Sequence, residues 1–197
     1  MASQSIAFSC TCGQVHGTIT GVAPNKGSHL KCYCKSCQTA AHVLGDDNAL
    51  DANGGTDVFQ TVPSKINFAA GEDKLACLRL SPKGLLRWYA SCCDAPLFSM
   101  PNVSWLALAG VNIARVKPED RAAFGAIRGL NAAKHAIDPP SNLVDFGVKR
   151  AMARLVWRAA KARVRGDSTA PFFTSKGDIA VTPRVLSREE RQTAAPH

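Results

Sequence analysis

The sequence predicts a mainly β fold with a C-terminal α-helical extension. Short apolar segments separated by Gly- and Pro-containing turns fill the first half of the 197-residue chain. Cysteines occur in small clusters that can join distant strands through metal ions. One long segment with helical periodicity lies nearer the C-terminus. We therefore divide the chain into a β domain at 5–100, a strand and helical extension at 101–166 and a polar tail at 167–197.

The first predicted element is a hairpin over residues 6–20. On both sides of its turn, apolar residues alternate with polar ones as in half-buried strands: Ile6, Phe8, Val15, Gly17 and Ile19. The turn contains Cys10-Thr11-Cys12-Gly13, and its glycine permits the tight bend that brings two sulfurs to one ion. His16 lies off this pattern, and we expect it to be an exposed strand residue.

Three cysteines within six residues form the most informative motif, Lys31-Cys32-Tyr33-Cys34-Lys35-Ser36-Cys37. Thiolates at C-x-C-x-x-C spacing can supply three of the four tetrahedral positions of a zinc ion. The motif holds no fourth Cys or His, so one position can be open, which distinguishes a reacting zinc from a structural one. His42 is a further candidate ligand, although we expect it to line a pocket or face solvent.

Two lysines flank this motif. Lys31 and Lys35 could offset the negative charge of three thiolates or attract a carboxylate, but solvated lysines are the expectation. A helical turn is predicted at 39–45, ending at a glycine. Short strands are predicted after it: 57–61, 66–68, 75–80 and 86–90. Cys77 stands alone in one of them, and we expect it to be a core thiol.

A second metal site is expected from the remaining cysteines. Cys10 and Cys12 need partners, and Cys92-Cys93 is the remaining cluster. A metal ion shared by the two pairs would tie the first strand to the end of the β domain and contribute folding energy. Disulfides are not expected, because the thiols are clustered and the chain is not small.

These motifs resemble those of the glutathione-dependent formaldehyde-activating enzyme and centromere protein V family. The resemblance covers roughly residues 5–98, and the segments 54–61 and 78–89 are similar to those of a bacterial branch of that family. It implies a β-tent-like zinc fold, with a structural zinc on the first and last motifs. It also implies a catalytic zinc on Cys32, Cys34 and Cys37 and carbon–sulfur chemistry on a glutathione adduct.

The last motif departs from the family's C-x-x-C-G form. Aligned on Pro96-Leu97, its second cysteine is Cys93, its glycine becomes Asp94, its first cysteine becomes Ala90, and Cys92 is extra. Neighbouring residues in an extended chain point to opposite sides. The hypothesis is that Cys93 joins Cys10 and Cys12, while Cys92 either completes that site through a local kink or faces the other zinc. One alternative is that the first site has only three protein ligands. The other is that this site has been lost.

The C-terminal half carries nearly all of the net charge of +9. One or two strands are predicted at 103–116, and a short helix at 119–130. The clearest helix is predicted at 143–165, where apolar residues recur at helical spacing: Val148, Met152, Leu155 and Ala159. Arginines and lysines cover most of the rest of this helix, and Gly166 marks its end. Such a helix can contact phosphates without reading a base sequence, or it can be a solvated face.

The function expected from these observations is a zinc-dependent, carbon–sulfur lyase-like enzyme acting on a glutathione or other thiol adduct, with one catalytic and one structural Zn²⁺. The alternative is a non-catalytic zinc module that contacts nucleic acid or a protein through 143–165. The start of the chain has no secretory leader and no apolar run is long enough to span a membrane, so a cytoplasmic protein is expected.

Overall fold

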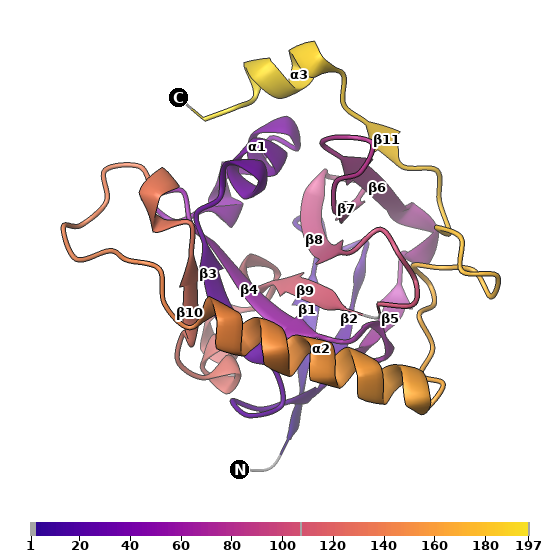
Figure 1. The fold of residues 1–197 in the computed structure, drawn as a ribbon. Coiled ribbons are helices and arrows are strands. Elements are labelled where there is room, and N and C mark those ends of the chain that lie inside the picture. Colours follow the sequence, from indigo (N-terminus) through magenta and orange to yellow (C-terminus); the bar gives the residue numbers. More distant parts are fainter. Residues whose placement is uncertain (1–2, 107, 197) are drawn as a thin grey trace.

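The computed structural model describes residues 3–106 and 108–196, and it is mainly β as predicted (Figure 1). A three-stranded antiparallel sheet has the order β1-β2-β5, and an eight-stranded sheet has the order β10-β3-β4-β9-β8-β7-β6-β11. In the small sheet the strands are β1 (Gln4–Ser9), β2 (His16–Val22) and β5 (Ile66–Ala70). Neighbouring strands of the large sheet are antiparallel except at its two ends, where β10 runs parallel to β3 and β11 runs parallel to β6.

The large sheet draws its strands from almost the whole chain. Its members are β3 (Ser28–Cys32), β4 (Thr56–Thr61), β6 (Leu75–Arg79), β7 (Leu86–Ala90), β8 (Ala95–Met100), β9 (Ala109–Asn112), β10 (Gly129–Asn131) and β11 (Arg184–Val185). The boundary drawn near residue 100 therefore falls inside this sheet, because β9 lies between β4 and β8. Short 3₁₀ helices connect several strands: η1 (Asp47–Ala49), η2 (Pro63–Lys65), η3 (Glu72–Lys74), η4 (Ile113–Arg115) and η6 (Ala133–His135).

The main core lies between the two sheets and is rich in aromatic rings. Phe8 of β1 meets Phe98 of β8 edge to face, with ring centroids 5.2 Å apart. Phe172, from the segment described above as a polar tail, is completely buried and packs 5.2 Å from Trp88. Each such ring removes a large apolar surface from water. The core therefore depends on both ends of the chain.

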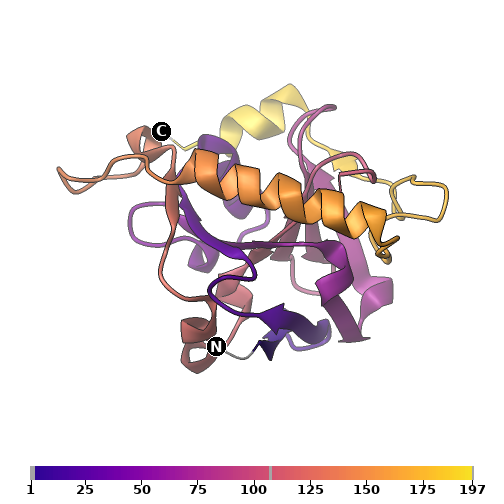
Figure 2. The same ribbon diagram turned by 60° about the horizontal axis from the view of Figure 1, so that its bottom comes forward.

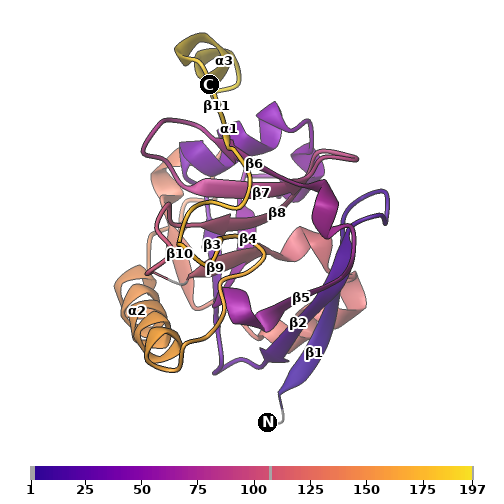
Figure 3. The same ribbon diagram turned by 90° about the vertical axis from the view of Figure 1, so that its right-hand side faces the viewer.

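Three α-helices lie outside this core. Ala40 of α1 (Lys35–Val43) and the C-cap residue Leu44 pack near Leu78 of β6. α2 (Val148–Val164) lies along β3, β4 and β10, and Figure 3 shows it on the side of the large sheet opposite β1, β2 and β5. Figure 2 shows α2 crossing the face of the molecule. α3 (Arg188–Thr193) lies next to α1. In the described part of the chain, every helix is too short or too polar to cross a bilayer.

Two predictions for the C-terminal half are corrected by the structure. The helix expected at 119–130 is a 3₁₀ helix, η5 (Pro118–Phe124), followed by β10. Gly125, with φ +73°, stops the helix, since this backbone conformation is left-handed. The long helix begins at 148 rather than 143, after Gly147 in the left-handed region. Of the strands expected at 103–116, one forms, at β9; residue 107 lies outside the described residues.

Candidate metal centres

Four cysteines from two distant hairpin turns meet in one cluster. Cys10 and Cys12 lie in the turn between β1 and β2, and Cys92 and Cys93 lie in the turn between β7 and β8. The ligand atoms of all four lie within 4.8 Å of one another. The Cys12 and Cys92 sulfurs are 3.3 Å apart, Cys10 and Cys12 3.6 Å, and Cys92 and Cys93 4.0 Å. This four-cysteine cluster joins the small sheet to the large one.

A tight turn brings the two adjacent cysteines to the same side. The N–H of Cys93 donates to the Ala90 carbonyl over 3.2 Å, and Asp94 has φ +52°. Asp is one of the few non-glycine residues that adopt the left-handed region readily. Asp94 therefore supplies the left-handed bend at the end of this turn. The kink that one alternative required for Cys92 is present, and Cys92 does not face the other cluster.

The spacing of these sulfurs fits a tetrahedral ion. Zinc–sulfur bonds of about 2.3 Å at tetrahedral angles place the sulfurs about 3.8 Å apart. Burial and the neighbouring thiols raise the pKa of Cys92 to about 12. Burial also acts to raise the pKa of Cys93, but N–H groups of Cys12 and Ala95 lower it to about 7. A bound cation would favour the thiolate form of all four.

The second cluster sits where β3 ends and α1 begins. Cys32 ends β3, Cys34 is the N-cap residue of α1, and Cys37 lies in the first turn of the helix. Their sulfurs also lie within 4.8 Å of one another, with Cys32 and Cys37 3.9 Å apart. Among the residues that the structure describes, no fourth Cys, His, Asp or Glu joins this three-cysteine cluster. The cluster therefore offers a metal ion three protein ligands and one free side.

The pKa values of the three thiols are shifted in opposite directions. Hydrogen bonds from Cys32 and Cys37 hold the pKa of Cys34 far below its usual value. Cys34 is the N-cap residue, next to the positive end of the helix dipole, which also favours a thiolate. The hydrogen bond with Cys34 raises the pKa of Cys32, and hydrogen bonds with Cys32 and then Cys34 raise the pKa of Cys37; burial adds to both increases. Neutral thiols therefore surround one thiolate until a cation stabilises all three as thiolates.

Two side chains that the sequence did not indicate contact the three-cysteine cluster. Asn131 in β10 donates from Nδ2 to the Cys32 sulfur over 3.3 Å. Arg87 in β7 places Nη1 3.9 Å from the Cys37 sulfur and donates from Nη2 to the Ser36 hydroxyl. No local signal marks either residue, because sheet pairing brings them from far along the chain. They supply the neutralising and orienting contacts that metal ligands commonly receive.

A small cavity opens beside Cys37. It has a volume of about 50 Å³, between α1 and strands β4, β7, β8 and β9, and Cys37, Arg87, Pro96 and Asn112 are among its lining residues. Only a small group fits inside it, so the rest of a larger ligand would remain outside. A larger groove of about 900 Å³ lies between α1 and α3, and it contains none of the cysteines.

The remaining candidate residues, two lysines and two histidines, form ion pairs or are exposed to solvent. Lys31 is not a solvated lysine: it forms an ion pair with Asp51 at 2.7 Å, whereas Lys35 is exposed as expected. His42 lies outside both clusters and pairs with Asp47 at 2.8 Å. The prediction of an exposed His16 is confirmed.

Cys77 is a core thiol, as predicted. Its side chain is buried, and burial raises its pKa to about 11. It lies outside both cysteine clusters among the residues searched for metal ligands. It therefore offers a control position at which a thiol can be removed without touching either cluster.

Comparisons with known proteins assign the chain to a family but do not indicate an activity. None of the curated proteins matches the chain. A crystal structure of a Rhodobacter sphaeroides protein is similar in part, with 16% identity and a TM-score of 0.43, over 64% of this chain and 100% of that one. A family model matches residues 2–180, which is most of the chain. The chain therefore belongs to DUF6151, a family of unknown function.

Proposed function

We propose that this protein is a zinc-dependent enzyme that makes or breaks a carbon–sulfur bond in a thiol adduct, with glutathione as the expected thiol. Cys32, Cys34 and Cys37 would hold the catalytic zinc, and Cys10, Cys12, Cys92 and Cys93 the structural one. The observation that carries this proposal is the contrast between the two clusters. One offers four thiols to an ion, and the other offers three and a free side next to a cavity.

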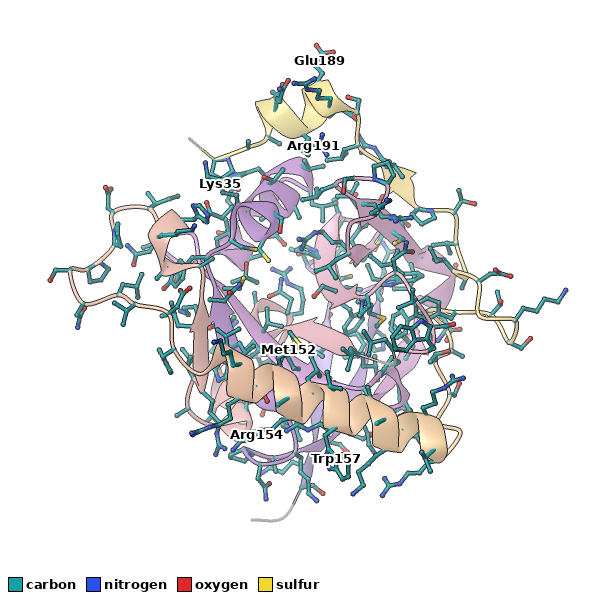
Figure 4. All side chains as sticks on the ribbon, viewed as in Figure 1. Lys35, Met152, Arg154, Trp157, Glu189 and Arg191 are labelled. Atoms are coloured by element: carbon teal, nitrogen blue, oxygen red, sulfur yellow. The ribbon has the colours of Figure 1, made fainter. Side chains whose placement is uncertain are left out.

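The bound zinc would supply a Lewis acid and a position for a substrate sulfur or oxygen. Three thiolates would give that centre a net charge near −1, which favours thiol exchange over strong activation of water. Arg87 reduces this charge from the cavity side, and its guanidinium can pair with a substrate carboxylate. Asn131 orients the Cys32 sulfur. Lys35, exposed at the start of α1 (Figure 4), is a second cation for the carboxylates of glutathione.

The cavity size fits the small end of such an adduct. In an adduct of glutathione with formaldehyde, the reacting carbon and its hydroxyl are only two heavy atoms beyond the sulfur. A cavity of about 50 Å³ accepts these atoms and excludes the peptide portion. In the cleavage direction the carbon–sulfur bond breaks and sulfur leaves with the electron pair. The hydroxyl proton passes through solvent to the departing sulfur as the carbonyl forms, so the products are the free thiol and formaldehyde.

The test is an exchange measurement with ¹³C-formaldehyde and glutathione, followed by NMR. Wild-type protein loaded with zinc should accelerate exchange between the free aldehyde and the adduct, and Cys34→Ser should abolish the acceleration while its circular dichroism spectrum stays unchanged. Cys77→Ala is the matched control, because it removes a thiol outside both clusters, and it should keep the activity. Equal exchange rates in the wild type and Cys34→Ser, or in the wild type and buffer, would refute a catalytic role for this cluster.

A second candidate function is a non-catalytic zinc module that contacts nucleic acid through α2. The observation that favours it is the composition of this helix, which contains seven Lys or Arg side chains between Lys149 and Arg165 counted with its C-cap, and no acidic residue. Retention on immobilised DNA should then weaken steeply as salt is raised. This candidate would be favoured over the enzyme if the protein binds two zinc ions, is retained on immobilised DNA and does not accelerate the exchange between aldehyde and adduct.

A further inference from the structure

A third pocket contains none of the cysteines, and five of its lining residues are lysines or arginines. It has a volume of about 360 Å³, between the C-terminal end of α2, the loop after β2 and η2. Its charged lining residues are Lys26, Lys65, Arg158, Lys161, Arg165 and Asp167. Lys26, Lys65 and the α2 residues are far apart in sequence, so folding brings their charges together. Pockets of this volume are typical of small-molecule sites.

The positive charge of this pocket is not balanced by the protein. Among the described residues, none of its five cations forms an ion pair. The one acid, Asp167, accepts a hydrogen bond from the Ser64 hydroxyl at 3.2 Å. The C-terminal end of α2 contributes about half a negative charge. With Asp167 and this dipole included, the pocket keeps a net charge of about +3.5. These like charges repel one another unless an anion is bound.

One of the cations is fixed in place. Arg158 is half-buried, and it donates to the Gly27 carbonyl at 2.9 Å and to the Ser28 hydroxyl at 3.3 Å. Burial and the nearby Arg154 lower its pKa. These contacts hold the guanidinium in one orientation, whereas the lysines around it can adjust to a ligand. Arginine with several lysines is the combination that proteins use to bind phosphate groups.

We propose that this pocket binds a phosphate-bearing ligand, held by Arg158 and by the lysines and arginine that surround it. Five cations around one pocket suit a group with several negative oxygens better than a single carboxylate. Trp157 is exposed beside the pocket, with the Lys161 ammonium 5.7 Å from its ring centre, and Figure 4 shows it projecting outward from α2. An organic group attached to the phosphate can therefore contact an indole surface. The site is independent of the metal centres and of the proposed thiol chemistry.

The test uses two double variants with the same change in charge on the same helix. Lys161→Gln with Arg165→Gln removes two exposed cations of the pocket, and Lys149→Gln with Arg150→Gln removes two exposed cations outside it. Calorimetric titration with inorganic pyrophosphate, at constant ionic strength, should show binding to the wild type. The pocket variant should bind roughly tenfold more weakly, and the control variant should bind within about twofold of the wild type.

Two results would overturn the proposal: no binding of pyrophosphate by the wild type beyond that of chloride, or an equal loss of affinity in both variants. The source of the phosphate is distinguished by vesicles of phosphatidylcholine with phosphatidylinositol phosphate. Vesicle binding that pyrophosphate displaces indicates a lipid headgroup, and pyrophosphate binding without vesicle binding indicates a soluble ester. Vesicle binding that pyrophosphate does not displace, and that both variants lose equally, would again contradict a pocket.

Discussion

Loss of the four-cysteine cluster should destabilise the whole protein, because the cluster is a cross-link between the two sheets. The perturbation is the double variant Cys92→Ser with Cys93→Ser. The cross-link joins Cys12 to Cys92, 80 residues apart. Closing a loop of this length in the unfolded chain costs about 4.5 kcal/mol of conformational entropy, and a bound ion that holds the loop closed stabilises the folded state by a similar amount.

That figure is large compared with the stability of an ordinary domain, which is about 5–15 kcal/mol. We therefore expect the double variant to lose one zinc per chain and about 4 kcal/mol of the free energy of unfolding. The assay is urea denaturation in excess zinc, followed by tryptophan fluorescence, since Trp88 is buried between the sheets. Cys77→Ala, the matched control, should keep both ions and lose only about 1 kcal/mol.

A double variant whose free energy of unfolding stays within about 1 kcal/mol of the wild type, although it has lost one zinc, would refute the cross-link argument. The sulfurs would then meet at a position that contributes no folding energy. A double variant that keeps both ions would refute the assignment of Cys92 and Cys93 as ligands.

Three further predictions concern the surroundings of the sites. Gly147→Ala should cost about 1–3 kcal/mol in thermal denaturation, since a Cβ at φ +68° would lie 2.1 Å from the Arg128 carbonyl oxygen; an unchanged melting temperature would contradict this. Burial acts to raise the pKa of Asp51, but hydrogen bonds from Lys31 and from backbone N–H groups outweigh it and lower the pKa. The stabilisation from Asp51 is therefore present above pH 3.8 and is lost as pH falls through the lowered pKa, so Asp51→Asn should destabilise the protein at pH 7 and be neutral in acid. Arg87→Gln should leave the zinc content unchanged and raise KM for the adduct at least severalfold; an unchanged KM would remove Arg87 from the substrate site.

Much of the β architecture was predictable from local signals. Alternation around the first turn predicted β1 and β2, and the turn residues between later apolar segments marked β4 to β7. Gly166, at φ +67°, ends α2 as expected, with the N–H of Asp167 donating to the Ala162 carbonyl. The grouping of cysteines followed from elimination, since the pairs at 10–12 and 92–93 lacked other partners.

The remaining features depend on contacts between residues far apart in sequence. The central position of β9 follows from its pairing with β4 and β8, and four residues carry too little pattern to show it. Arg87 and Asn131 reach the three-cysteine cluster across 50 and 99 residues of chain. The bend at Asp94 was not predictable either, because an aspartate is compatible with an extended strand end as well as with a left-handed turn.

The most direct test of this account is the number of zinc ions bound per chain, measured by native mass spectrometry. We predict two zinc ions per chain for the wild type, one for Cys34→Ser and one for Cys12→Ser. A different ion should be lost in each variant, so the combined variant should bind none. A wild-type protein that stays folded and free of metal in excess zinc would contradict these predictions, as would either variant that still binds two.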